Sequence, residues 1–284
     1  MNLIKKNYIL KKISLIMMIL FLGGCSNGIL SPKGDIVRQQ HLIILSSLTM
    51  MLLIVIPVIV MTLYFIWKYR ESNKITVYTP NWNHSNIIEI CIWSIPIIII
   101  FVLALLSWSS THVLEPSKPI ITNKKSCPIV IEVVSLDWRW LFIYPDYNIA
   151  TINEISIPVN TPILFKITSS SVMNSFFIPS LGSQIYAMKG MKSILYLIAN
   201  HSGQYKGISA NYSGEGFSNM KFIVTVHNNY DRFYRWIQIV KTSDLYLSTF
   251  NDFKKISKQN KNSNIIHFSN IEPNLFNKIL KSIN

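Results

Sequence analysis

Two long apolar runs near the N-terminus constrain the fold of this chain more than any other feature. The first, Leu42 to Trp67, holds no charged side chain, and the second, Ile87 to Trp108, holds only Glu89. A helix rises about 1.5 Å per residue, so roughly 20 residues cross the hydrocarbon core of a bilayer. Each run is therefore predicted to be a transmembrane helix, at about 42–67 and 87–108.

Basic residues between the two runs predict their orientation. Lys68, Arg70 and Lys74 lie in the connecting loop, which the positive-inside rule places in the cytoplasm. The chain then runs outside, inside and outside again, and everything after the second helix lies on the outer, periplasmic side. The chain is 50% hydrophobic with a mean hydropathy of +0.32, which is typical of membrane segments joined to a separate polar domain.

Residues 1–24 have the pattern of a bacterial lipoprotein signal peptide. Four lysines precede a short apolar stretch, Ile13 to Leu22, which is too brief to span a bilayer. Leu22-Gly23-Gly24-Cys25 then matches a lipobox, whose cysteine is acylated, with palmitate for example, and becomes the mature N-terminus. We predict a covalent lipid at Cys25. The alternative is an ordinary N-terminal anchor in which Cys25 is incidental.

Beyond the second helix the pattern changes to that of a β-domain. A polar connector with Pro116 and Pro119 leads into short runs that often alternate apolar and polar residues, as in Glu154-Ile155-Ser156-Ile157. This density of short strands predicts an antiparallel sandwich of about 100 residues within 111–227. The predicted strands are 129–134, 138–144, 154–157, 163–168, 184–188, 194–198, 205–208 and 220–226.

The last part of the chain, 228–284, is predicted to be a helical extension. Helical spacing is present in Tyr230 to Val240, Leu245 to Ile256 and Asn274 to Ile283. The last of these is amphipathic, so its apolar face must pack on the sandwich or on a partner subunit. With residues 25–110 as the N-terminal segment and membrane hairpin, the chain divides into four parts.

Charge and cysteine content exclude two classes of protein. The net charge is +14, but the lysines are scattered and form no cluster interleaved with aromatic residues, so we expect no nucleic-acid partner. Cys25, Cys91 and Cys127 are too far apart in the sequence for a paired metal motif, and they imply no disulfide framework.

Several stretches together resemble subunit II of bacterial haem-copper oxidases, specifically of the bo-type ubiquinol oxidases. They are Trp67-Lys68-Tyr69-Arg70, the region from His84 through Glu89 to Trp93, Asp137-Trp138-Arg139-Trp140, Val172 to Gly182, and Phe268 to Phe276. The resemblance implies a membrane-anchored α+β protein: a two-helix transmembrane hairpin, a cupredoxin-like antiparallel β-sandwich and a C-terminal helical extension.

The loop from Ile208 to Phe222 keeps the spacing of the copper-binding loop of such subunits, C-x3-C-x3-H-x2-M, without most of its ligands. Ser209, Ser213, Phe217 and Met220 stand on those four positions. Copper selects thiolate and imidazole ligands, which serine and phenylalanine cannot replace.

Two further positions of the motif can be compared with the family. Asn174 stands where copper-bearing relatives have a ligand histidine, and Asn211 stands where any residue supplies a backbone carbonyl. Only Met220 survives as a side-chain ligand, and a lone thioether usually belongs to a core. The six histidines lie elsewhere, so we expect no metal or other cofactor in this chain.

Two features carried open alternatives. Glu89 is a candidate for proton uptake into a channel of the large subunit, as the resemblance implies, or a carboxylate that reaches the membrane interface. Trp138 and Trp140 match a run that accepts electrons in cytochrome-c-using relatives, although aromatic packing is the simpler expectation here.

The resemblance implies subunit II of a proton-pumping ubiquinol oxidase of the aerobic respiratory chain, in the bacterial cytoplasmic membrane. No catalytic residue is expected in this chain, because the haems, copper and ubiquinol site are expected in the large partner subunit. Membrane lipid and the other oxidase subunits are further expected partners. The alternatives are a copper-bearing cytochrome c oxidase subunit II and a non-enzymatic membrane lipoprotein.

Overall fold

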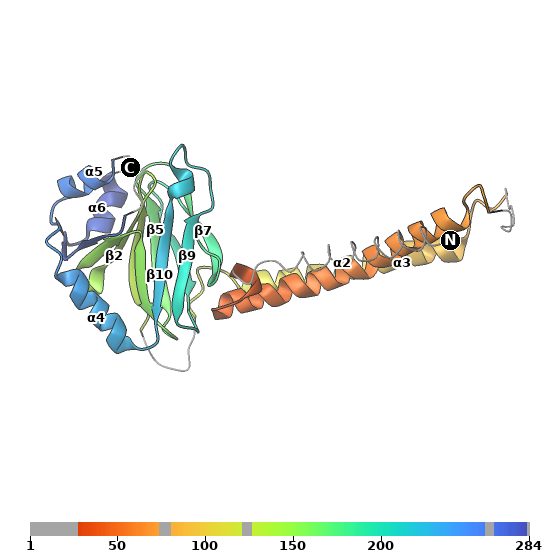
Figure 1. Cartoon of the computed structure of the whole chain (residues 1–284), viewed down its shortest axis with the longest axis horizontal. Helices are drawn as coiled ribbons and strands as arrows, with labels where there is room; N and C mark the ends of the chain where they lie inside the picture. Colours follow the sequence, from red (N-terminus) through yellow and green to blue (C-terminus); the bar gives the residue numbers. More distant parts are fainter. Residues whose placement is uncertain (1–27, 74–80, 121–126, 259–263, 283–284) are drawn as a thin grey trace, which may run out of the picture.

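The structure is a computed structural model that describes residues 28–73, 81–120, 127–258 and 264–282. A pair of long helices projects from one side of a β-sandwich, and the C-terminal segment covers the opposite side (Figure 1). The signal peptide and Cys25 lie outside the described residues, so the lipidation prediction has no structural counterpart here.

The two apolar runs form the helices α2 (Asp35–Lys68) and α3 (Asn86–Val113). Both are long and apolar enough to cross a membrane. Helix α2 begins seven residues before the apolar run, because its first turns dock on the sandwich. Val37 is fully buried there, and a Cβ on Gly182 would lie 3.0 Å from Ile36 Cγ2, so a glycine is needed at this crossing.

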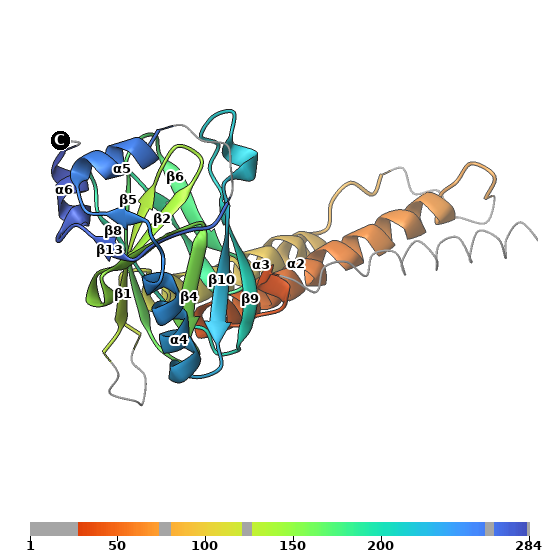
Figure 2. The same cartoon turned by 60° about the vertical axis from the view of Figure 1, so that its left-hand side comes forward.

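The sandwich consists of two main sheets, which are drawn in Figure 1 and from a turned view in Figure 2. The six-stranded sheet has the order β12-β3-β2-β1-β5-β8, and the five-stranded sheet has the order β4-β10-β9-β6-β7. Their strands are β1 (Ile129–Ser135), β2 (Trp140–Tyr144), β3 (Ile149–Ile152), β4 (Glu154–Pro158), β5 (Ile163–Ser169), β6 (Asn174–Ile178), β7 (Gly182–Ala187), β8 (Ser193–Leu197), β9 (Gly203–Ser209), β10 (Lys221–His227) and β12 (Ile266–Phe268).

The predicted sandwich is confirmed, but two of its strand pairs are parallel and it contains strands that were not predicted. Strand β1 pairs with β5 in parallel, and β10 pairs with β4 in parallel, whereas the other pairs of the two main sheets are antiparallel. Strands β3 and β6 were not among the predicted runs. Strand β3 has only four residues, and all of them are buried, so it shows no alternation of apolar and polar side chains.

Aromatic side chains fill the space between the sheets. Phe176 stacks on Phe222 at a ring distance of 5.2 Å, and both rings meet Trp140 and Phe142 at an angle. All four rings are buried. Burial of this much aromatic area is the dominant stabilising term of such a domain.

The C-terminal extension packs on the sandwich in two places. Its first helix contributes Phe233, Trp236, Ile237 and Val240 to the core between the sheets, and the segments after it cover the outer face of the six-stranded sheet. It contains α4 (Tyr230–Lys241), β11 (Tyr246–Leu247), α5 (Phe250–Ile256), β12, β13 (Asn270–Ile271) and α6 (Leu275–Ser282). A second apolar cluster joins it to the sheet, where Leu141 and Ile143 pack with residues such as Phe253 and Phe276. Strand β2 is consequently buried on both faces.

The prediction for this extension was wrong in one segment. Leu245 to Ile256 does not form one helix, because Thr249 caps a shorter helix by accepting a hydrogen bond from Asp252 N, and the residues before it form β11. Strand β12 also pairs with β3, so the extension is partly β-structure and completes a sheet of the sandwich.

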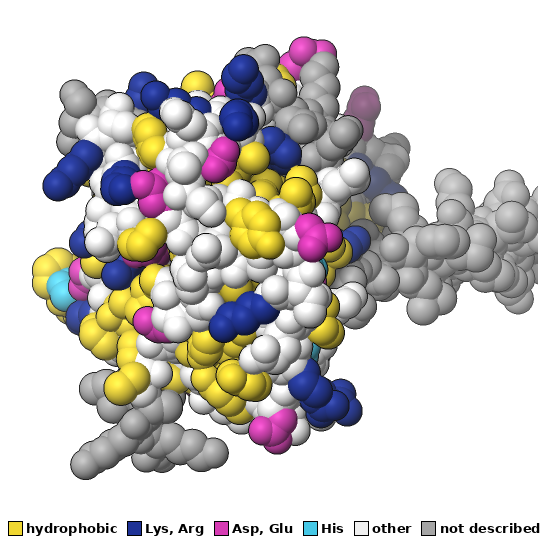
Figure 3. Space-filling view, turned by 90° about the vertical axis from the view of Figure 1, so that its left-hand side faces the viewer, with side chains coloured by type: hydrophobic (Ala, Val, Ile, Leu, Met, Phe, Trp, Pro, Cys, Tyr) yellow, Lys and Arg dark blue, Asp and Glu magenta, His cyan; other side chains and the backbone are white. Residues whose placement is uncertain are grey.

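The outer face of the extension carries side chains of both charges among the residues that the structure describes. In Figure 3, Lys and Arg side chains are spread among acidic, apolar and neutral ones over this face.

Candidate functional site: the loop with the copper-site spacing

Three strands bring two of the altered ligand positions, Asn174 and Ser209, together with Ser135 in a buried hydrogen-bonded cluster. Asn174 of β6 donates from Nδ2 to Ser135 Oγ of β1 at 2.7 Å, and Ser209 of β9 donates to Asn174 Oδ1 at 3.0 Å. Asn174 and Ser135 are fully buried, and Ser209 is 5% exposed. We call these three residues the polar clip. The clip ties the two sheets together at this end of the sandwich.

Trp138 holds the rest of the loop from the other side. Its backbone has a φ of 67°, which is rare for a bulky residue, and its indole Nε1 donates to Ser213 O at 3.1 Å. Gly216 packs against the indole ring so closely that an added Cβ would lie 2.3 Å from Trp138 Cδ2. The prediction of a strand from 138 to 144 is therefore wrong at its start, since Trp138 belongs to a turn and β2 begins at Trp140.

The two tryptophans have different surroundings. Trp140 is fully buried among core aromatic rings, which confirms the packing interpretation for that residue. Trp138 is only partly buried and contacts the loop instead. The pair is therefore not one aromatic unit.

The residues present do not fit a copper pair. Asn174 and Ser209 use their polar atoms in the clip, and Phe217 packs its ring 5.8 Å from that of Tyr212. Asn211 donates from Nδ2 to Met173 O and Tyr212 O, both at 3.3 Å. Met220 is 1% exposed and belongs to the apolar core, and the hydroxyl of Ser213 offers no soft ligand. Among the described residues, no three His, Cys, Asp or Glu side chains converge as a metal site.

Glu89 lies in the first turn of α3, at the end remote from the sandwich. Its side chain is 56% exposed, and Oε1 lies 3.8 Å from His84 Nδ1. The two residues lie at the end of the helix that the sequence places in the cytoplasm. Cys91 and Cys127 are free and exposed.

Sequence reasoning missed the partners of the altered positions. Ser135 contacts Asn174 across 39 residues of sequence, and nothing in its local pattern signals this contact. The same is true of the joint between the sandwich and the extension, where His267 Nε2 lies 2.6 Å from Glu154 Oε2. Such contacts depend on strand register, which the local sequence does not specify.

His227, the last residue of β10, gives the stability of the sandwich a predicted pH dependence. Its Nε2 lies 2.6 Å from Ser156 Oγ, and burial, together with Arg232, lowers the pKa of the imidazole below its ordinary value of 6.5. The unfolded chain then binds the proton more readily than the folded chain, so the contribution of His227 to stability is lost as the pH falls below about 6.5.

We expect His227→Gln to reduce the loss of thermal stability between pH 7 and pH 5, measured on the full chain in detergent. His201→Gln, at an exposed histidine, is the matched control and should behave like the unaltered chain. Equal acid sensitivity of His227→Gln and the unaltered chain would contradict the assignment.

A sandwich of this type on a membrane hairpin, with the spacing of a copper loop, defines the class of haem-copper oxidase second subunits. The family model described as Cytochrome C oxidase subunit II, periplasmic domain, matches residues 148–227. The cytochrome bo(3) ubiquinol oxidase subunit 2 of Buchnera aphidicola subsp. Baizongia pistaciae is 53% identical over 98% of this chain and 96% of that protein. The protein of the same description from Pseudomonas aeruginosa is 48% identical over 92% of this chain and 78% of that protein. The chain belongs to the family of ubiquinol oxidase subunit 2 proteins.

The periplasmic domain of subunit II of cytochrome oxidase of Bradyrhizobium japonicum matches 40% of this chain and 94% of its own length, at 22% identity and a TM-score of 0.39. The two apolar helices and the match to a periplasmic domain fit a membrane protein with a periplasmic domain.

Proposed function

We propose that this chain is the second subunit of a proton-pumping ubiquinol oxidase of the bacterial cytoplasmic membrane and binds no copper itself. The observation that carries the proposal is the coordinated change at Asn174 and Ser209, which lie in separate segments and yet bond to each other. A single lost ligand would leave a defective site, whereas this pair forms a satisfied polar contact. Family membership supports quinol as the reductant of the complex.

The proposed role of the chain is to support the large catalytic subunit rather than to transfer electrons. Without a copper relay in the sandwich, quinol dissolved in the bilayer must reduce the large subunit directly. The haems, the copper and the quinol site then belong to that partner. Metal analysis of the purified full chain tests this role: bound copper at two atoms per chain would overturn it, and its absence is the expected result.

An exposed apolar surface of the sandwich supports a contact surface for the large subunit. Edge strand β7 begins against α2 and runs away from it along the side of the sandwich nearest the helix pair (Figure 1). At its far end, Val172, Met173, Tyr186 and Met191 are each between 42% and 56% exposed. We call these four residues the edge patch. An apolar patch beside a membrane hairpin suits a protein that protrudes from the same membrane.

Substitutions that place negative charge on the edge patch test this contact surface. We expect the double substitution Tyr186→Asp and Met191→Asp to lower the haem recovered with this chain at least fivefold in mild detergent, because it places charge in a desolvated interface. The matched control is Ile239→Asp with Leu245→Asp, on the extension, where the side chains are 62% and 51% exposed. Equal haem recovery from both double variants would contradict the proposed contact between the edge patch and the large subunit.

Glu89 is proposed to assist proton uptake at the cytoplasmic face. Its exposed carboxylate beside His84 can exchange protons with water at the start of a membrane helix. We expect Glu89→Gln to slow oxygen consumption severalfold while haem content and assembly stay unchanged. Glu71→Gln, in the loop between the helices, is the control and should turn over normally. Unaltered turnover and proton uptake in Glu89→Gln would leave the carboxylate with an interfacial role only.

The predicted lipid at Cys25 would add a third attachment to the membrane. Acyl chains at the N-terminus and two transmembrane helices would anchor the chain far more firmly than either a single acyl chain or a peripheral contact. Intact-mass measurement of the purified chain tests this, since acylation at Cys25 requires removal of the preceding 24 residues.

A further inference from the structure

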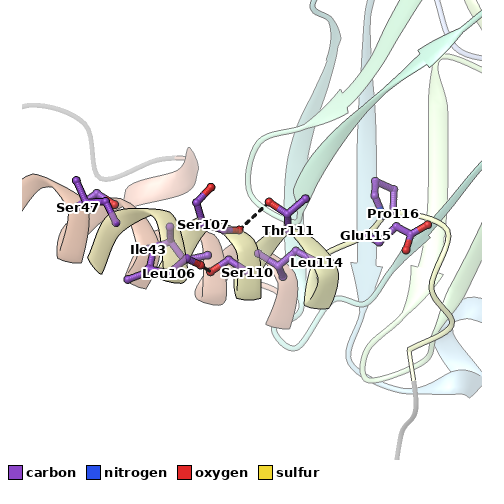
Figure 4. Close-up of a pocket in the computed structure, with 10 residues that line it drawn as sticks. Ile43, Ser47, Leu106, Ser107, Ser110, Thr111, Leu114, Glu115 and Pro116 are labelled. Atoms are coloured by element: carbon purple, nitrogen blue, oxygen red, sulfur yellow. Dashed lines mark hydrogen bonds between the residues drawn. The ribbon is translucent and has the colours of Figure 1, made fainter. Parts of the chain in front are cut away.

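A groove lies between α2 and α3 at the end next to the sandwich. It has a volume of about 580 Å³, and its lining includes Ser47, Leu106, Ser110 and Glu115. Figure 4 shows these side chains along the two helices and the segment that follows α3. The groove is not part of the clip, the edge patch or the surroundings of Glu89. Its volume is within the range of pockets that hold small ligands.

The depth of the groove matches the outer edge of the bilayer. Roughly 20 helical residues cross the hydrocarbon core, so a span that starts at Ile87 leaves it near residue 107. Leu103 and Leu106 then lie within the hydrocarbon, Ser110 lies at the interface, and Glu115 follows the end of the helix. The lining therefore changes from apolar to charged along the membrane normal.

The hydroxyls of the groove do not make it polar. Ser110 Oγ donates to Leu106 O at 2.6 Å, and Thr111 Oγ1 donates to Ser107 O at 2.8 Å. Both groups satisfy their donors within the helix, as serine and threonine commonly do in membrane helices. The small side chains leave space between the helices, and the surface of that space is mostly hydrocarbon. An acyl chain fits such a surface.

Glu115 lines the outer end of the groove, and Lys118 follows it in the segment after α3. The carboxylate of Glu115 accepts a hydrogen bond from Ser117 Oγ at 2.7 Å, and Lys118 donates from Nζ to His112 O. Both side chains are exposed to further partners. A carboxylate three residues from an ammonium group complements a headgroup that carries an amine and a phosphate.

We infer that the groove binds one phospholipid of the outer leaflet with an amine-bearing, zwitterionic headgroup. One acyl chain lies along Leu103 to Ser110, the headgroup ammonium group meets Glu115, and the phosphate lies toward Lys118. The inference requires that α2 and α3 cross the membrane, and it is independent of the electron donor and of copper content. The bound lipid would fill the space between two helices that otherwise pack loosely at this end.

Photo-crosslinking tests the site in the assembled complex. The probe is a phosphatidylethanolamine with a diazirine on one acyl chain, incorporated with the purified complex into lipid nanodiscs. We expect adducts on the peptide that contains residues 103–116. Ser110→Phe, which fills the groove, should lower the adduct yield at least fivefold, whereas Ser109→Phe, on the neighbouring exposed serine outside the groove lining, should not.

The headgroup assignment has its own comparison. The same probe with a glycerol headgroup should give a lower adduct yield than the ethanolamine form, and Glu115→Gln should remove this difference while haem content and quinol oxidase activity stay unchanged. Equal yields from Ser110→Phe and Ser109→Phe would overturn the site. An excess of crosslinks from a photoreactive residue at 110 to the large subunit would also overturn it, because a protein helix would then occupy the groove.

Discussion

Asn174→Leu is expected to lower the free energy of unfolding of the sandwich by about 3 kcal/mol, because it leaves two buried hydroxyl groups, those of Ser135 and Ser209, without their partner. The asparagine side chain donates to Ser135 Oγ and accepts from Ser209 Oγ, and both serines are buried. Without it, Ser209 Oγ keeps only the longer contact of 3.4 Å to Asn211 O. Pulse proteolysis of the full chain in detergent measures the effect.

A triple substitution separates this penalty from a packing defect. Replacing Ser135 and Ser209 by alanine in the Asn174→Leu background removes the unsatisfied groups, and we expect it to recover most of the lost stability. Asn211→Leu is the control, since its side chain donates only weak bonds at the rim of the loop. If the triple variant were as unstable as Asn174→Leu, hydrogen bonding would not be what the clip contributes.

Gly216→Val is expected to cost about 2–3 kcal/mol of unfolding free energy, as overpacking of a close contact does. A Cβ at this position would overlap the ring of Trp138, and Trp138 has little freedom to retreat because its backbone and its indole N–H are both held. Thermal unfolding of the full chain in detergent measures the change.

Removing the Trp138 ring should relieve the clash with the valine. Trp138→Ala in the Gly216→Val background should be more stable than the sum of the two single changes predicts, because it removes the ring that the valine strikes. Ser218→Val places the same side chain on an exposed position of the same loop and should be nearly neutral. Strict additivity of the Trp138 and Gly216 substitutions would contradict the proposed contact.

The polar clip shows which parts of the site could be predicted from the sequence alone. Motif spacing identified Asn174 and Ser209 as altered ligand positions, and the apolar runs identified both membrane helices, because each is a local pattern. The bond between Asn174 and Ser209, and the third partner Ser135, depend on the register of three strands, which local sequence leaves open.

The errors have the same origin. Trp138 was predicted as the start of a strand because it opens a short strand-like run, whereas in the structure it lies in a turn with a φ of 67° and its ring packs against Gly216. The segment from Leu245 was predicted as helix from its spacing, and pairing between Tyr246 and Asn270 prevents it. In each case a contact that is distant in the sequence overrides a local preference.

A sandwich with the spacing of a copper loop, but with a polar clip in place of copper ligands, is expected in an oxidase that is reduced by quinol. Oxygen uptake by the purified complex tests it most directly, with ubiquinol or with reduced cytochrome c as the only donor. We predict rapid uptake with ubiquinol and none above background with cytochrome c. Uptake driven by cytochrome c at a rate comparable to that with ubiquinol would contradict the account.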